Sequence, residues 1–299
     1  MNRIVLLSMA SIILFAGCKE EPDNNIPEVV DENKQVIVSF STQLFYTQPV
    51  SNFSLKSTAT MDENSITKII LFGIDEQGNV FETYEPLSNS SLPVESVITI
   101  SKKVKALYAI ANPTTEMESA NTPLMDLLVD YSKAPKSPFV MSGYSDITDA
   151  SVDIKLVRSV AKVEIKINNL DNSTVSVQNT PNKGFVFKQE TLSVPTSAAR
   201  ISYSSDSSSE SAVFYVAENT SSDTDATQFV VTGVFNGKQA NYTFALTSEK
   251  QKISIERNTH YIVNVSPITE SECTAIISIP DWVDVILDDH VIPDENFEL

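Results

Sequence analysis

Few side chains in this sequence are of the types that bind metals or act as nucleophiles. The chain has two histidines, His260 and His290, and two cysteines, Cys18 and Cys273. It contains no His-Glu-x-x-His, no Cys-x-x-Cys, no Gly-x-Ser-x-Gly turn and no phosphate-binding glycine loop. We therefore predict no metal site, no cofactor and no catalytic residue, and we expect that the protein is not an enzyme.

Carboxylates are the remaining candidates for chemistry. Two acids far apart in a sequence can meet in space and hydrolyse a glycosidic bond, so a glycosidase is a minor alternative. The acidic residues from Asp281 to Glu295 could also bind calcium. Their spacing lacks the glycine and the regular ligands of a calcium loop, which favours a solvated acidic tail.

The best-defined chemical group is the thiol of Cys18. Arg3 is followed by an apolar run from Ile4 to Phe15 and by small residues just before the cysteine. This run is too short to span a membrane and is typical of an export signal, so residues 1–17 are predicted to be a signal peptide. The cysteine at the cut resembles a bacterial lipobox. An ordinary signal peptide with a chance cysteine is the alternative.

The resemblance to a lipobox implies a lipid anchor on Cys18. The thiol would carry diacylglycerol and the new amino group a further acyl chain such as palmitate, and two or more chains anchor a protein stably. The acidic stretch Lys19–Asp23 resembles the signal that sends lipoproteins of Bacteroidetes-type bacteria to the cell surface. We expect an outer-membrane lipoprotein that faces the outside of the cell.

The charge of the chain limits its partners. Lysine and arginine number 21, aspartate and glutamate 39, and the net charge is −18. This excess argues against nucleic acid and anionic membrane surfaces as partners. Residues 18–34 are acidic, contain prolines and lack aromatic residues, so they are predicted to be a flexible linker. Cys273 has no cysteine partner once Cys18 is lipidated and is interpreted as a small buried side chain.

Short runs rich in Val, Ile, Thr, Phe and Tyr dominate the rest of the sequence and predict β-strands. The clearest is Val160–Ile167, where apolar and charged residues alternate and indicate one buried and one solvated face. Glu116–Tyr131 is the one helix candidate. The other predicted strands are Val36–Phe40, Lys68–Asp75, Asn79–Tyr84, Val94–Ile100, Val104–Ala111, Val152–Val157, Phe185–Lys188, Ala212–Val216, Gln228–Phe235, Ala240–Leu246, Tyr261–Val265, Thr274–Ile279 and Val283–Leu287.

This pattern predicts an all-β fold with one or two short helices, arranged as two tandem β-sandwich domains. The first domain is expected to span residues 35–154 and the second residues 155–299. Asp75–Gly78 and Phe235–Lys238 are predicted hairpin turns.

Several stretches together resemble the fimbrillins, the subunits of type V pili in Bacteroidetes-type bacteria. Ile255–Tyr261 is similar to the family's Arg-Asn-x-x-Tyr segment, and Cys273–Trp282 to its closing strand. Phe214–Asn219 matches a Tyr-Val-x-Glu-Asn run, and Leu156–Val163 resembles the opening of the second domain. Leu107–Asn112 and Met141–Gly143 are further short matches.

The resemblance implies that the two β-sandwich domains are of the transthyretin-like or Greek-key type. It also implies a structural or tip subunit that polymerises by strand exchange. A protease removes the first strand of the precursor, and the terminal strand of another subunit fills the groove by β-augmentation. The displaced strand would be Val36–Phe40, with Val36, Val38 and Phe40 on one face. The donor would be the C-terminal tail at about 283–299, where Val283, Val285, Leu287 and Val291 supply the apolar positions. A tail strand that folds back on its own domain is the alternative.

The resemblance implies a cut after an arginine in the loop that follows the first strand. This sequence departs from that pattern, because no arginine lies between Cys18 and Arg158. We predict that a trypsin-like surface protease cuts between Lys56 and Ser57 instead. The partners would then be other pilus subunits, joined head to tail, and a host or bacterial adhesion receptor that the sequence does not identify. Two alternatives stay open: an uncut anchor subunit of the pilus, and a surface glycan-binding lipoprotein, whose exposed aromatic residues would stack on sugars.

Overall fold

A computed structural model of the protein describes residues 33–42, 61–118, 122–204, 211–220, 225–248 and 251–279. Nearly all regular structure in these residues is β-strand, which confirms the predicted all-β fold. Among them, no helix has the length and apolar character needed to cross a membrane.

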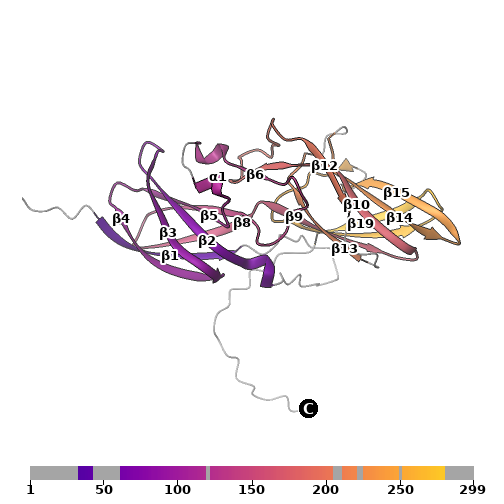
Figure 1. Ribbon diagram of the computed structural model, residues 1–299, viewed down its shortest axis with the longest axis horizontal. Coiled ribbons are helices and arrows are strands. Elements are labelled where there is room, and N and C mark those ends of the chain that lie inside the picture. The colour runs from indigo at the N-terminus through magenta and orange to yellow at the C-terminus, as the bar shows by residue number, and fades with distance from the viewer. Residues whose placement is uncertain are drawn as a thin grey trace, which may run out of the picture. The chain divides into compact units, whose positions relative to one another are not determined.

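Seven strands of the first half form one sheet with the order β3-β2-β5-β7-β8-β1-β4. Strands β1 to β5 and β8 of this sheet are labelled in Figure 1. Their bounds are β1 Asn33–Thr42, β2 Ser65–Ile74, β3 Val80–Ser91, β4 Val94–Ser101, β5 Ala106–Ala111, β7 Met141–Asp146 and β8 Ser151–Arg158. Strands β7 and β8 share only the pairs Met141 with Arg158 and Ser142 with Val157. The two parts of the sheet on either side of this junction enclose one hydrophobic core, and we call this unit the N-terminal sandwich.

Two four-stranded sheets of the second half pack face to face, with the orders β12-β10-β14-β15 and β13-β9-β18-β19. The ring of Phe214 meets that of Phe229 from the opposite sheet, with centroids 6.1 Å apart. We call this unit the C-terminal sandwich. The bounds are β9 Val160–Ile167, β10 Asp171–Pro181, β12 Arg200–Ser204, β13 Ser211–Ala217, β14 Gln228–Phe235, β15 Lys238–Ala245, β18 His260–Pro267 and β19 Cys273–Ser278.

A third apolar cluster covers the outer face of β2 and β5. It contains Phe72 and Ile110 from these strands together with Leu127, Phe139 and Val186 from connecting segments. The short elements of these connections are η1 Met61–Asn64, α1 Thr115–Glu118, η2 Leu124–Asp126, β6 Leu128–Asp130 and β11 Lys183–Phe185; β16 Thr247–Ser248 and β17 Gln251–Lys252 form a small ribbon elsewhere.

The prediction of a helix over Glu116–Tyr131 is wrong. The chain forms the single turn α1, the 3-10 turn η2 and the strand β6 over this range. Pro123 lies within the range and has no backbone N–H to continue a helix. Val129 instead pairs with Gly184 of β11 and is buried, so tertiary contacts determine the structure here.

The predicted hairpin turns are present. Gly78 adopts a φ of +83°, and its N–H donates to the Asp75 carbonyl at 3.1 Å. Asn236 and Gly237 both have positive φ, as a two-residue turn between β14 and β15 requires. Cys273 is half-buried against the C-terminal core, and burial raises the pKa of its thiol. Ile154, the proposed end of the first domain, lies within β8, and the division at this residue stays a prediction.

Candidate functional site

Strand β1 lies in the interior of a sheet. It pairs antiparallel with β4, from Asn33 opposite Ser101 to Phe40 opposite Val94. On its other side it pairs parallel with β8, from Ile37 opposite Ser151 to Thr42 opposite Leu156. Both edges of β1 are therefore hydrogen-bonded.

The inward face of β1 is part of the N-terminal core. Val36 and Val38 are 0% exposed and Phe40 is 1% exposed, whereas Ile37 on the opposite face is 45% exposed. The three inward residues pack in one cluster with side chains such as Leu71 of β2. A groove lined by core residues would therefore replace β1 if the strand left the sheet.

Strand β4 depends on β1 for its place in the sheet. In the part of the chain that the structure describes, β4 is the last strand of its sheet and its ladder is formed with β1. Loss of β1 would expose the backbone N–H and C=O groups of β4 and β8 on the two sides of the groove. Such groups can pair with an incoming strand.

The other predicted site residues lie outside the described residues. They are Cys18, Lys56, Ser57, Val283, Val285, Leu287 and Val291. Residues 43–60 connect β1 to η1, so the predicted cut after Lys56 falls between these two elements. Lipidation, cleavage and strand donation by these residues stay predictions.

The turn η1, which follows this connection, is held by a buried ion pair. Glu63 is 1% exposed, and its Oε1 lies 2.7 Å from the Nζ of Lys162 in β9. The hydroxyl of Tyr215 in β13 donates a hydrogen bond to the same carboxylate oxygen. Since β9 and β13 belong to the C-terminal sandwich, this ion pair joins it to the start of β2.

Arg158 at the end of β8 adds hydrogen bonds to this cluster. Its Nε donates to the Glu63 carbonyl at 3.1 Å, and its Nη1 donates to Asn258 Oδ1 at 2.9 Å. Nη2 donates to Asn64 Oδ1. The side chain is fully buried, and burial lowers the pKa of Arg158 to about 10, opposed by its electrostatic interactions with Glu63 and Tyr215. The guanidinium is still charged at neutral pH.

His260, the first residue of β18, is buried beside this cluster. Its Nε2 lies 3.3 Å from Glu164 Oε2. Burial and the Lys162 ammonium lower the pKa of His260 to about 4, against the opposing charges of Glu164 and Glu63. The imidazole is therefore neutral at pH 7.

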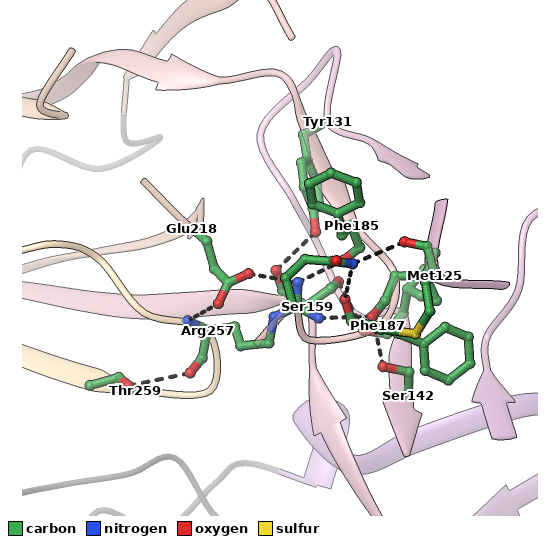
Figure 2. Close-up of polar contacts among 12 residues, drawn as sticks. Met125, Tyr131, Ser142, Ser159, Phe185, Phe187, Glu218, Arg257 and Thr259 are labelled. Carbon is green, nitrogen blue, oxygen red and sulfur yellow. Dashed lines mark hydrogen bonds and ion pairs between the residues drawn. The ribbon is translucent and has the colours of Figure 1, made fainter. Parts of the chain in front are cut away.

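A second buried ion pair links Arg257 to Glu218, with Nη2 2.6 Å from Oε2 (Figure 2). The same guanidinium donates to the carbonyls of Phe185 at 2.7 Å and Val186 at 2.8 Å. Nearby, the Tyr131 hydroxyl donates to the Ser159 carbonyl at 3.0 Å. The Arg257 bonds hold the end of β11 and the residue after it against the segment before β18. The Tyr131 bond holds the residue after β6 against the residue before β9.

The sequence motifs contain Arg158, Glu218 and Arg257, but the sequence did not predict that these residues lie near one another. In the structure they contribute to buried polar clusters where the two sandwiches meet. The partner Glu63 was missed. The prediction that the charged face of Val160–Ile167 is solvated is also wrong at Lys162, which is buried against Glu63.

The arrangement holds strands in place through buried ion pairs and hydrogen bonds. Within the described residues, no three His, Cys, Asp or Glu side chains come together in a group that could hold a metal ion. The guanidinium groups of Arg158 and Arg257 donate hydrogen bonds within these clusters, whereas Arg257 Nε is buried without a hydrogen-bond partner among the described residues.

No protein-family model matches the chain, and no curated protein matches it by sequence. Solved structures resemble it closely in fold. The tip fimbrial protein Mfa3 from Porphyromonas gingivalis, in a form with a C-terminal truncation, superposes with a TM-score of 0.60 at 16% identity, covering 83% of this chain and 100% of that one.

Two further structures agree. A fimbrial assembly protein from Parabacteroides distasonis has a TM-score of 0.55 at 10% identity, over 82% of this chain and 95% of its own. A protein from Bacteroides eggerthii, assigned to cell adhesion by inference, has a TM-score of 0.58 at 16% identity, over 83% of this chain and 96% of its own. The chain therefore has the fimbrillin-like fold found in fimbrial and cell adhesion proteins of Bacteroidetes.

Proposed function

We propose that this protein is a subunit of an adhesive fimbria of the type V kind, and not an enzyme. It would be exported as a lipoprotein acylated at Cys18, displayed on the cell surface and cut by a trypsin-like protease. Removal of β1 would then allow subunits to polymerise head to tail. Adhesion to a host or bacterial surface would be the role of the filament.

The environment of β1 is the observation that carries this proposal. A strand hydrogen-bonded on both edges, with Val36, Val38 and Phe40 buried, leaves an apolar groove with two open backbone edges when it is removed. Only another strand satisfies both the backbone groups and the apolar pockets. Because groove and donor are different parts of one molecule, the contact is heterologous and builds a filament.

The anchoring of η1 supports a cut in the connection before it. Glu63 follows Lys56 closely in the sequence and is fixed by Lys162, Arg158 and Tyr215. A cut between Lys56 and Ser57 would free β1 while β2 stays attached through this ion-pair cluster. The processed subunit would thus keep the rest of its fold.

The donor would be the C-terminal tail at about 283–299. Its apolar residues Val283, Val285 and Leu287 stand at every second position and would share one face of a strand. The pockets that Val36, Val38 and Phe40 would leave have the same spacing. The tail of one subunit would thereby replace the strand lost by the next.

Lysine substitution tests the proposal. Wild type, Lys56→Ala and the control Lys102→Ala would be displayed as lipoproteins, treated with trypsin, and studied by intact-mass analysis and electron microscopy. We expect wild type and Lys102→Ala to give a species beginning at Ser57 and filaments, and Lys56→Ala to give neither. Filaments from uncut Lys56→Ala would contradict processing at this residue, and an acylated, uncut wild type at the base of filaments would identify an anchor subunit.

A further inference from the structure

Two tyrosines stack on the outer face of the N-terminal sandwich. Tyr108 of β5 and Tyr144 of β7 are cross-strand partners, and their ring centroids lie 4.9 Å apart with the planes inclined by 13°. Tyr144 is 64% exposed, so a ring face is presented to solvent on a regular strand. The paired backbones of β5 and β7 hold the two rings in a fixed orientation.

A buried aromatic residue supports the pair from below. The ring of Phe187 meets Tyr108 edge to face at 5.4 Å and is 2% exposed. The Gln189 amide donates to the carbonyls of Phe187 at 3.2 Å and Met125 at 2.9 Å, which ties together the two segments labelled by Phe187 and Met125 in Figure 2. Tyr108 is therefore the fixed base of the stack.

A hollow of about 500 Å³ opens beside Tyr108. Its walls are Ile74 and the hairpin tip Gly78–Val80 on one side, and the segment Thr122–Met125 on the other. The lining mixes apolar surface, from Val80 and Met125, with an amide and a hydroxyl group. Tyr108 belongs to both the hollow and the stack, so the two features form one continuous surface.

We propose that this surface, the Tyr108–Tyr144 stack with its adjoining hollow, binds a neutral saccharide. Sugar rings have an apolar C–H face that packs on aromatic rings, and hydroxyl groups at the rim that need hydrogen-bond partners. Tyr144 supplies an exposed ring, and Asn79 and Thr122 supply polar groups at the hollow. The volume lies within the roughly 300–1,000 Å³ typical of small-ligand sites.

Charge favours a neutral rather than an anionic sugar. The chain carries a net charge of −18, which repels polyanions. If this face binds saccharides, the adhesive fimbria proposed above would recognise neutral sugars on its target surface. The saccharide site depends on that adhesive role for its biological meaning, whereas the binding itself does not require strand exchange.

Saccharide binding by the full, uncut protein tests the proposal. The probes would be maltohexaose, laminarihexaose, mannohexaose and hexa-N-acetylchitohexaose, with hexagalacturonate as the anionic comparison, and the readout saturation-transfer NMR followed by titration. We expect at least one neutral probe to bind. Tyr144→Ala should weaken that binding about tenfold, the loss expected for one aromatic contact of about 1.4 kcal/mol, whereas Tyr144→Phe should keep the stack and stay close to wild type.

Two further variants localise the site. Asn79→Ala should weaken binding, because it removes the amide at the hollow. Ile276→Ala is the matched control, since Ile276 of β19 is 63% exposed in the C-terminal sandwich and should leave binding unchanged.

The proposal is overturned if no neutral probe binds, if only hexagalacturonate binds, or if Tyr144→Ala binds as tightly as wild type. These results are separate from filament formation. Filaments without saccharide binding would remove this inference alone, and binding without filaments would remove the assembly proposal alone.

Discussion

Glu63 Oε1 and Lys162 Nζ lie 2.7 Å apart and form an ion pair that is almost completely shielded from solvent. Glu63 precedes β2 of the N-terminal sandwich, and Lys162 lies in β9 of the C-terminal one. A buried ion pair is strongly destabilising when one partner is removed, because the other charge is left uncompensated. This pair therefore fixes the chain next to the connection that we propose is cut.

Lys162→Met should lower the free energy of unfolding by about 3–5 kcal/mol, since it leaves Glu63 buried without its cation. The control is Lys238→Met. Lys238 and Glu270 are also 2.7 Å apart but are largely exposed, and such surface pairs contribute little. Guanidinium unfolding curves of both variants measure the difference, and equal losses would contradict the importance of burial here.

Stability should fall as the pH is lowered from about 6.5 toward 4. The pKa of His260 is about 4 in the folded protein and near its ordinary 6.5 when unfolded, so the unfolded chain binds the extra proton first. The contribution of His260 to the free energy of unfolding is fully present above pH 6.5. Between pH 6.5 and pH 4 it decreases by at most about 1.4 kcal/mol per pH unit. Urea unfolding of wild type and His260→Gln at several pH values measures this pH dependence. If the free energy of unfolding changes equally with pH in both proteins, His260 is not its cause.

Arg257→Lys should loosen β11 and the residues that follow it. A lysine cannot contact Glu218 and both carbonyls, of Phe185 and Val186, with the fork geometry of a guanidinium. We expect faster amide hydrogen exchange for residues 183–188, measured by mass spectrometry. Arg200→Lys is the control, because its contact with Asp225 is 3.7 Å and partly exposed. Unchanged exchange in Arg257→Lys would show that the guanidinium does not hold the segment.

Val38→Ala should cost about 2 kcal/mol of unfolding free energy, because it removes two buried methyl groups from the core face of β1. Its neighbour Ile37 is 45% exposed on the opposite face, so Ile37→Ala should change stability by less than about 0.5 kcal/mol. Thermal or denaturant unfolding of the uncut protein distinguishes the two. A larger loss at Ile37 would mean that the opposite face is buried.

Strands with a clear apolar alternation were predictable from the sequence. Val160–Ile167 and Gln228–Phe235 have the same bounds in the structure. Strand β10 was missed because Asp171–Pro181 is mostly Ser, Thr, Asn and Gln, with Val175 and Val177 as its buried apolar residues. Pairing with β14 makes it a strand, and that partner is distant in the sequence.

The interior position of β1 could not be read from local sequence either. Val36, Val38 and Phe40 indicate a strand with one buried face, whereas its neighbours β4 and β8 follow from long-range pairing. The same holds for the ion pair, since Glu63 lies in a polar stretch with no local signal. Lys162 in β9 was the one local sign of this ion pair, because a charged residue on a strand face can be paired with another charge as well as solvated.

The groove left by β1 can be tested with a peptide. Protein cut after Lys56 and freed of residues 1–56 would be mixed with a peptide of residues 33–42, or with the same peptide carrying Val38→Asp, and assembly would be followed by electron microscopy. We predict that the native peptide occupies the groove and keeps the protein monomeric, while the Val38→Asp peptide leaves filaments to form. Filaments that grow unchanged in the presence of the native peptide would contradict assembly through the β1 groove.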